Sequence, residues 1–545
     1  MSLLLSHVAE ALRWPRFPFF GVPHASGLAV VRPRTPDPGP RTEQPRLLLI
    51  GTATDHWSSA LVAELAADRE VAEALTEVYA CAVADVAEEP ALAVLAQQAL
   101  GIFAEASGWP CLLVLTPEGA PFGASPWRPV RDRERTAGLA RVLLEAAEAW
   151  HTREEDCRAD AQRFARLRAG LLAPAEGRPL RPNLALEAAE AAAMEAADPL
   201  EGGFGPAPRL NDAELLSFLL ARCARPDVPL GLTQQVERTL VARLASGVHE
   251  HLRGGFTRGS ADSAGREPFH DLRLTDQARL AVVLHRAATV LGQPMLIEAA
   301  HRVVDRVLAD LHLGDGAFAH GLHADAPAAA GAWEDGAHRR WTEAQVADVV
   351  GSEGARILAE RFGLGETSAV PVLSATTPDH RRLGEVAARW AAAAAERPAP
   401  RRDERVLAVE QGQWLWALAT LKVPGTEALT AQAAAVCRRQ EATDPLAAAW
   451  LARGLIAHGD RPAARAFAAR AFAAVDVHGH VRLASDTLGD TDTADGPGGA
   501  GLLALLALDL GRTEDARRLI DAHRDRLRQA PLAMASLAEA LERLG

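Results

Sequence analysis

The stretch Gly51-Thr-Ala-Thr-Asp-His-Trp-Ser-Ser-Ala60 decides the fold class of the N-terminal part of the chain. It follows an apolar, strand-like run, Arg46–Ile50, and it opens a pattern typical of a helix. Further along, Gly108-Trp-Pro110 leads directly into a second strand-like run, Cys111–Leu115. A strand that leads into a helix start, and later a proline that enters another strand, together predict an α/β domain whose helices pack on a sheet.

The same alternation extends over residues 46–130. Between the two strand-like runs we expect a helix, a strand and a second helix, at about Asp55–Leu75, Val78–Val86 and about Pro90–Ala106. Residues 1–45 are poorly patterned, and the proline-rich stretch Arg32–Arg41 excludes a helix or a central strand there. The sequence therefore predicts an unpatterned segment over 1–45, followed by an α/β domain over 46–130.

From about residue 131 the sequence becomes rich in Ala, Leu, Arg and Glu, with apolar residues at helical spacing. Residues 131–182 are expected to form a helical linker. Beyond it, helices alternate with loops that contain Gly, Asp and His, which favours an all-α toroid of paired helices over 183–545. The loops and inner helix ends of such a toroid form one central pocket. A solenoid of short repeats is the alternative, but no fixed repeat period is visible.

Composition excludes several classes of function. The chain has 545 residues, 48% of them hydrophobic, which fits more than one globular domain. Its net charge of −13 argues against nonspecific binding to nucleic acid or to an anionic membrane. No apolar run reaches the roughly 18 residues that span a bilayer, and the first residues lack the basic start of a signal peptide. We expect a cytoplasmic protein.

Reactive side chains are few. Lys422 is the single lysine and lies in a turn-like segment, so Schiff-base catalysis is not expected. The five cysteines are scattered without any C-x-x-C, which favours a reducing compartment and no disulfide framework. Cys81 and Cys111 lie in strand-like runs and are expected to be buried.

Three stretches of the α/β domain carry a family resemblance. Ala53–Leu61 aligns with S-T-C-H-W-C-H-V-M, Ala84–Ala91 with V-D-R-E-E-R-P-D, and Ser107–Phe122 with G-G-W-P-x-x-V-F-L-T-P-D-G-x-P-F. The chain resembles the family of thioredoxin-domain proteins, of the DUF255 type, typified by spermatogenesis-associated protein 20 and its bacterial relatives. The resemblance implies a thioredoxin-like domain followed by an (α/α)6 toroid of the six-hairpin glycosidase type.

The matches continue in the same order through the helical region. They stand at Gly202–Asn211, Arg253–Asp262, Pro268–Ala278, Ala317–Asp325 and Asp403–Gly412. The chain also departs from the family pattern in a consistent way. Both site cysteines, the cavity lysines and several cavity aromatics of the family are replaced. The chain is therefore identified as a divergent member of this family.

Asp55 and Ser58 stand where the resemblance places the two redox cysteines. Thiol–disulfide exchange needs a thiolate at a helix N-terminus and usually a second thiol, so we predict no dithiol redox activity. Both residues are instead suited to capping the helix start. The alternative interpretation is a partner-binding surface built from His56, Trp57 and Pro110, whose bond to Trp109 the resemblance implies is cis. An exposed Trp57 would support that surface.

The second candidate site is a toroid pocket of carboxylates and aromatic rings, a combination typical of sugar binding and glycoside chemistry. Its candidate residues are Phe256, Arg258, Asp262, His270, Asp271, Asp276, Gln277, Asp325, Glu334, Trp341, Glu410 and Trp414. In the structural alternative, Asp262 and Asp276 are helix caps or loop ties. For epimerase-type acid–base chemistry, the candidates are His270, His320 and His323.

No metal site, cofactor or nucleotide site is predicted. His320-x-x-His323-x-Asp325 has a spacing that can bind a metal, but loop histidines at such spacing are mostly incidental. The leading hypothesis is a protein without dithiol redox activity whose toroid binds a small, sugar-like molecule. The alternatives are a carbohydrate-active enzyme (epimerase, isomerase or hydrolase) in the toroid, and a non-catalytic scaffold whose thioredoxin-like face binds a partner protein.

Overall fold

The computed structural model describes residues 44–134, 136–171, 179–328, 332–373, 380–442, 444–484, 487–488, 492 and 496–545. Contacts divide the chain into two units. The first comprises Met1–Pro174 and Arg482–Gly489, and the second Ala175–Val481 and Asp490–Gly545. Nearly all of the unpatterned segment expected over 1–45 lies outside the described residues. Among the residues that are described, no helix combines the length and the apolar character needed to cross a lipid bilayer.

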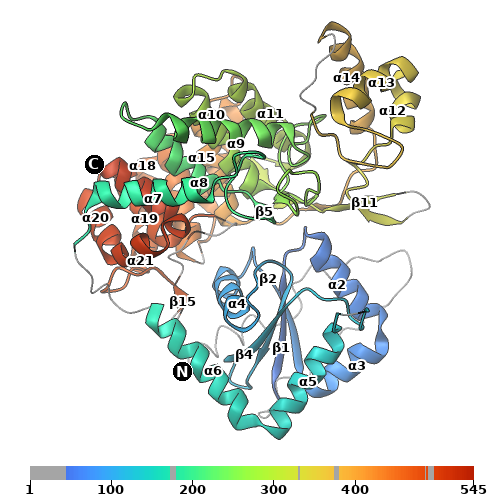
Figure 1. Ribbon diagram of the computed structural model, residues 1–545. Helices are drawn as coiled ribbons and strands as arrows, with labels where there is room; N and C mark the ends of the chain where they lie inside the picture. The colour runs from blue at the N-terminus through green and yellow to red at the C-terminus, as the bar shows by residue number, and fades with distance from the viewer. Residues whose placement is uncertain are drawn as a thin grey trace. The chain divides into compact units, whose positions relative to one another are not determined.

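A four-stranded mixed sheet forms the centre of the first unit (Figure 1). In the order β2-β1-β3-β4, its strands are Ala80–Asp85, Arg46–Gly51, Cys111–Leu115 and Pro121–Pro126. β1 is parallel to β2 and antiparallel to β3, and β4 is antiparallel to β3. Alternate side chains point to opposite faces, so Leu47 and Leu49 join one apolar cluster while Leu48 and Ile50 join another. Both faces are buried, which explains the unbroken apolar run of β1.

Helices cover both faces of this sheet. The Leu47 cluster includes residues of α2 (His56–Ala67), α3 (Arg69–Val78) and α5 (Leu139–Thr152). The Leu48 cluster includes residues of α4 (Pro90–Phe103) and α6 (Glu154–Leu171). This arrangement, with strand and helix in alternation, is the α/β domain that the sequence predicted.

Two details of the first unit differ from the sequence prediction. The single helix expected over about 55–75 is divided at Asp68, whose side chain accepts a hydrogen bond from the Val71 amide and so caps α3. The Asp68 carboxylate also pairs with Arg131 at 2.6 Å. Residues 131–182 were expected to link the two parts of the chain, but α5 and α6 pack on the sheet because Trp150 and Phe164 are buried in its two clusters.

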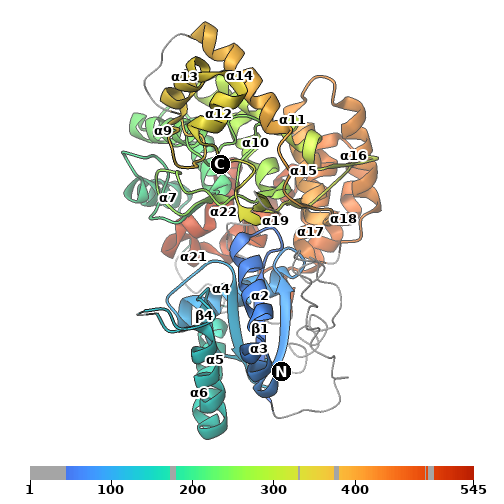
Figure 2. The ribbon, with the colours of Figure 1, turned by 90° about the vertical axis from the view of Figure 1, so that its right-hand side faces the viewer.

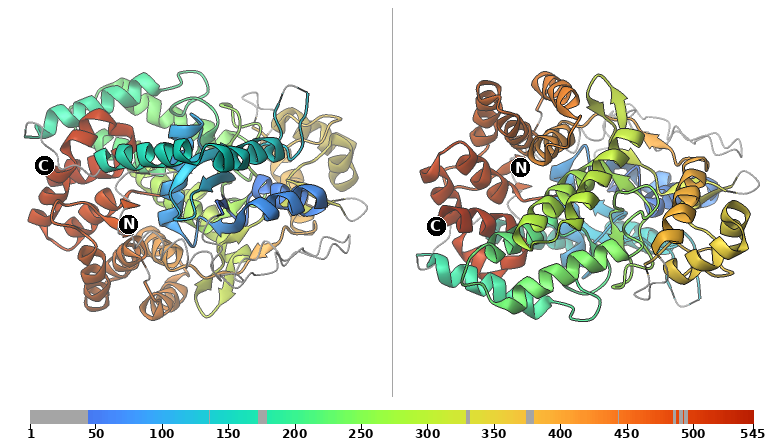
Figure 3. Two further views of the ribbon diagram at one scale, coloured as in Figure 1. Left: turned by 90° about the horizontal axis from the view of Figure 1, so that it is seen from below. Right: turned by 90° about the horizontal axis from the view of Figure 1, so that it is seen from above.

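The second unit is a closed ring of paired helices. Among the described residues, six inner helices each pack against the next, and the last packs against the first. These helices are α8 (Ala213–Cys223), α10 (Leu274–Val290), α15 (Ala408–Leu421), α17 (Pro445–His458), α19 (Gly499–Asp509) and α22 (Ala535–Leu544). The ring can be followed from above in Figure 3, and its α15–α18 part in Figure 2.

A second layer of helices surrounds this ring, each pairing with inner helices. They are α7 (Pro182–Ala196), α9 (Leu230–Ala245), α11 (Met295–Asp310), α16 (Glu427–Arg439), α18 (Arg461–Ala473) and α20 (Thr513–Ala522). Because inner and outer helices alternate along the chain, the inner helices run in one direction and their N-termini meet at one end of the ring. The architecture is the predicted (α/α)6 toroid.

Short elements fill the loops of the second unit. Three helices, α12 (Glu343–Val350), α13 (Ser352–Phe362) and α14 (His380–Ala395), form a satellite between α11 and α15, with a core of their own around Trp341 and Trp390. Other short elements of this unit are β5 (Arg209–Leu210), β6 (Gly259–Ser260), β7 (Leu272–Arg273), β8 (His312–Gly314), β9 (Ala317–Phe318), β10 (Gly321–Leu322), β11 (Asp325–Pro327), β12 (Trp333–Asp335), β13 (Arg402–Asp403), α21 (Arg524–Gln529) and a 3-10 turn at Pro531–Met534. The hairpin of β14 (Arg482–Ala484) and β15 (Thr487–Leu488) belongs to the first unit.

Candidate functional site

The degenerate redox site lies where β1 ends and α2 begins. Asp55 is the N-cap of α2, and its Oδ2 accepts hydrogen bonds from the Ser58 amide at 2.7 Å and the Ser58 hydroxyl at 2.8 Å. The Ser58 Oγ in turn accepts from the Thr52 amide at 3.3 Å. Asp55 is 2% exposed and Ser58 0%. The two residues at the cysteine positions are thus buried and bonded to each other, as a helix cap requires.

Two residues that the sequence analysis did not single out complete this loop. Asp85, at the end of the neighbouring parallel strand β2, accepts a hydrogen bond from the Ala53 amide at 3.1 Å. Gly51 leaves room for Ser58, because a Cβ at that position would lie 2.5 Å from the Ser58 Oγ. The signal for Asp85 was its place at the strand end, since the carboxyl ends of parallel strands meet at one edge of a sheet.

The aromatic side chains beside this cap are partly accessible. Trp57 is 40% exposed and contacts His56 and Trp127 edge-to-face, with ring centroids 5.1 and 4.7 Å apart. Pro110 is buried, and the Trp109–Pro110 bond is cis, as the resemblance implied. The first unit therefore presents an exposed tryptophan beside a closed, hydrogen-bonded loop.

The thiols are placed away from any reactive environment. Cys111 is fully buried in β3, and burial raises its pKa. Burial also raises the pKa of Cys81 and of Cys437, each to about 12. Burial also raises the pKa values of Cys157 and Cys223. Since the thiolate is the nucleophile in disulfide exchange, these cysteines are protonated and unreactive at neutral pH.

Several residues predicted to line the toroid pocket have structural positions instead. Phe256 and Trp414 are buried in the main apolar core, and Trp341 in the satellite core. Asp262 accepts hydrogen bonds from the amides of Arg266 and Glu267 and ties its own loop. Asp262 therefore ties a loop, and the three aromatic rings pack in apolar cores.

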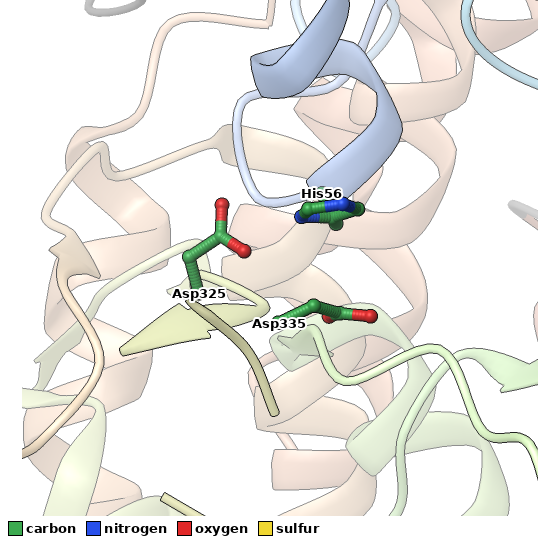
Figure 4. A group of neighbouring side chains, drawn as sticks. All are labelled: His56, Asp325 and Asp335. Carbon is green, nitrogen blue, oxygen red and sulfur yellow. The ribbon is translucent and has the colours of Figure 1, made fainter. Parts of the chain in front are cut away.

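Two predicted carboxylates, Asp325 and Glu334, lie on one short hairpin. Asp325 is opposite Asp335 in the β11–β12 pair, and Figure 4 labels both of these side chains. Glu334 lies next to Asp335 and is exposed. Asp276, in contrast, is fully buried, so it does not share the exposed position of Glu334.

Other predicted residues lie close together, but they pair with neighbouring side chains and do not line a pocket. Asp276, at the start of α10, is fully buried between Arg273 at 2.9 Å and Arg279 at 3.1 Å. Glu410, at the start of α15, bonds to His320 Nδ1 at 2.9 Å. Four further members are also buried: Arg258 pairs with Asp271 at 3.5 Å, His270 lies beside Gly336, and Gln277 bonds to both backbone groups of Phe256.

The axis of the toroid contains a small polar cavity that the sequence analysis missed. Its volume is about 30 Å³, which is room for a water molecule or two. Its charged and aromatic lining is Glu214, Arg279, Arg286, Trp416, Arg453 and Glu539. Ion pairs cross or border it, including Arg279–Glu214 at 2.9 Å and Arg286–Glu539 at 2.9 Å. The sequence did contain a signal for this cavity, because isolated charged residues interrupt the otherwise apolar inner helices.

Two polar groups beside this cavity are electrostatically unusual. Burial, aided by the charge of Glu214, raises the pKa of Asp492 to about 7, although it accepts hydrogen bonds from the amides of Gly498 and Ser536. Gln413 is 1% exposed, and neither its Oε1 nor its Nε2 has a hydrogen-bond partner. A buried amide without partners is costly, so Gln413 marks a place where a bound molecule or water would be stabilised.

Comparison with known proteins gives matches for each part of the chain. Residues 37–168 match the family model described as protein of unknown function, DUF255. The mouse protein spermatogenesis-associated protein 20 is 26% identical over 61% of this chain, and the human protein is 27% identical over 57%. These matches cover only 44% and 40% of the two relatives' own lengths.

Solved structures match about two thirds of the chain. A cellobiose 2-epimerase from Bacillus thermoamylovorans matches 63% of this chain and 87% of its own, with 10% identity and a TM-score of 0.38. A family 76 glycoside hydrolase (mannosidase) from Bacteroides thetaiotaomicron matches 67% and 97%, with 10% identity and a TM-score of 0.27. The toroid assignment rests on the helix contacts described above. Over residues 37–168 the chain matches the family model DUF255, and the chain is similar to spermatogenesis-associated protein 20.

Proposed function

We propose that this chain acts by binding and has no dithiol redox activity. The observation that carries the proposal is the Asp55–Ser58 cap, because both positions are used for buried internal hydrogen bonds. A thioredoxin-type reaction needs a thiolate at this helix start, and no thiol is offered there. The raised pKa values of Cys81 and Cys437 support the same conclusion, since neither thiol ionises at neutral pH.

Reduction of insulin disulfides by dithiothreitol tests this proposal. The wild-type chain should not accelerate the reaction beyond dithiothreitol alone. The double variant Asp55→Cys/Ser58→Cys should accelerate it if the helix start still lowers a thiol pKa, and Asp55→Ser/Ser58→Ala serves as the matched variant without thiols. Acceleration by the wild-type chain would refute the proposal, and single substitutions of its five cysteines would then locate the reactive thiol.

The binding site proposed for the toroid is its axis. The cavity combines carboxylates, guanidiniums and Trp416. Gln413 lies near the cavity residue Arg279, since a Cβ on Gly496 would be 3.8 Å from Gln413 Nε2 and 3.9 Å from Arg279 Nη1, and both polar atoms of its amide group are unused. Polar groups around an aromatic ring are the components of a small-molecule or sugar site. The present cavity is smaller than a sugar, so binding requires the Glu214–Arg279 and Arg286–Glu539 ion pairs to rearrange.

A thermal-shift screen against neutral and acidic sugars tests the axial site. A true ligand should stabilise the wild-type chain, and Gln413→Leu and Trp416→Ala should each remove the shift. Trp333→Ala is the control, because Trp333 is equally aromatic but exposed on β12. A ligand whose effect survives both axial substitutions would place its site elsewhere.

One observation favours a second candidate function, a scaffold that binds a polypeptide. Trp57 is 40% exposed, and its ring contacts those of His56 and Trp127. Exposed aromatic side chains are common anchors in protein interfaces. A reduced and alkylated insulin B chain is a suitable probe, because it is extended and has no free thiol. Trp57→Ala should weaken its binding at least tenfold, whereas Trp333→Ala should leave it unchanged; equal binding by all three chains would exclude this surface.

A further inference from the structure

Arg306 and Arg339 are two of the buried arginines of the second unit that do not line the axial cavity. Arg306 lies near the C-terminal end of α11, and Arg339 follows the β11–β12 hairpin. Their side chains are 2% and 4% exposed. Guanidinium groups are rarely this buried unless every N–H group is paired.

The partners of these two arginines do not pair all of their N–H groups. Arg339 donates from Nη2 to the Gly247 carbonyl at 2.7 Å, and its Nε lies 3.6 Å from Glu250 Oε2. Arg306 Nε lies 2.8 Å from Asp310 Oδ2. The Nη1 atoms of both arginines are buried and have no hydrogen-bond partner, and the same is true of His338 Nδ1.

The charges around these groups are predominantly positive. Five guanidiniums act on this cluster against three carboxylates: Arg253, Arg302, Arg306, Arg339 and Arg397 against Glu250, Asp310 and Asp335. Burial and the neighbouring guanidiniums lower the pKa of Arg306 to about 10, and those of Arg339 and His338 are lowered as well. One Asp310 carboxylate serves both Arg253 and Arg306. The cluster therefore has more donors and more positive charge than its own carboxylates satisfy.

The loop beside Arg306 is held against α11. Gly254 and Gly255 both have a φ of +84°, and a Cβ on Gly254 would lie 2.7 Å from the Arg302 carbonyl oxygen. A Cβ on Gly255 would lie 3.1 Å from Arg306 Cγ. Only glycine permits this close approach, so the backbone itself encloses the guanidinium.

From the unpartnered Nη1 atoms and the excess of guanidiniums, we infer that Arg306 and Arg339 form a binding site for a small oxyanion. The planar guanidinium fork matches the oxygen spacing of phosphate and carboxylate groups. An oxyanion would accept from both Nη1 atoms, and it would supply the missing negative charge. The site goes beyond the proposed axial function, because none of its groups lines the axial cavity.

Thermal unfolding and isothermal titration of the full chain with inorganic phosphate test this site, with acetate and chloride as comparison anions. Phosphate or acetate should raise the unfolding midpoint in a saturable way, because a ligand that binds only the native state stabilises it. Arg306→Gln and Arg339→Gln should each weaken binding by roughly tenfold to a hundredfold, the effect of one charge-assisted hydrogen bond. Preference between phosphate and acetate identifies the oxyanion class.

Two further variants give the experiment independent outcomes. Glu250→Gln removes a carboxylate that competes with phosphate for Arg339. It should therefore tighten phosphate binding, whereas the two arginine substitutions weaken it. Arg222→Gln is the control, since Arg222 is a half-buried arginine paired with Glu190 and Glu542. It should lower stability without changing the response to phosphate. Stabilisation by chloride alone, an unchanged response in the arginine variants, or weaker binding by Glu250→Gln would overturn the inference.

Discussion

Replacing Asp55 by alanine should destabilise the start of α2 by an amount that the structure defines. Loss of the N-cap acceptor costs about 1 kcal/mol. The substitution also leaves the buried Ser58 N–H and O–H groups without an acceptor, and each such group costs about 1 kcal/mol. The expected loss is therefore about 2–3 kcal/mol, more than an exposed helix cap would give.

Native-state hydrogen exchange is the appropriate assay, because the chain has two units and a global unfolding curve would mix them. A loss of about 2–3 kcal/mol corresponds to exchange about 30 to 150 times faster for the first amides of α2. Asp55→Asn keeps a carbonyl acceptor and should change exchange by less than about fivefold. Ser58→Ala should fall between the two variants.

The reasoning would fail if Asp55→Ala accelerated exchange by less than about fivefold, or if Asp55→Asn behaved like Asp55→Ala. Either result would mean that the carboxylate does not hold the loop. Exchange of amides in α4, on the opposite face of the sheet, provides an internal control. It should be unchanged if opening of the α2 start is local.

Gly412→Ala should destabilise the toroid by about 2 kcal/mol or more, because its Cβ would lie 2.5 Å from the Trp450 backbone; Gly384→Ala, with open space around it, should be neutral or stabilising in the same urea titration. A milder effect at Gly412 than at Gly384 would refute the contact. Trp150→Ala should cost the first unit about 3–5 kcal/mol, measured by exchange in β3, if α5 belongs to its core. The raised pKa of Asp492 means that the folded state keeps a proton that the unfolded state loses, so stability should fall as pH rises from about 4 to about 7. Asp492→Asn should abolish that component, and an unchanged pH profile would argue against it.

Most helices and strands could be predicted from the sequence. Where each one begins and ends, however, depends on contacts with residues that are distant in sequence. The strand β1 and the start of α2 followed directly from an apolar run and a capping residue. The break at Asp68 did not, because its carboxylate is stabilised partly by Arg131, which is far away in sequence. The burial of Trp150 and Phe164 on the sheet was also hidden, since a charged amphipathic helix gives the same pattern in a linker as in a domain.

The toroid site was harder to predict for a geometric reason. Aromatic residues at helical spacing fit equally well in a core and in a pocket, and Phe256, Trp341 and Trp414 all belong to cores. The residues that line the axis come from different inner helices, and the sequence does not show which face of each helix points inward. Charged residues in otherwise buried helices, such as Glu214 and Arg279, were the better signal.

The distribution of paired and unpaired polar groups indicates where binding should be sought. At the start of α2, Asp55 and Ser58 bond to each other, and Asp276 is paired with Arg273 and Arg279, so these carboxylates already have partners. Gln413 and the Nη1 atoms of Arg306 and Arg339 are different, because they are buried without partners. A buried unpaired donor is destabilising unless something occupies the space beside it. These three side chains are therefore the positions at which substitution should change ligand response more than it changes stability.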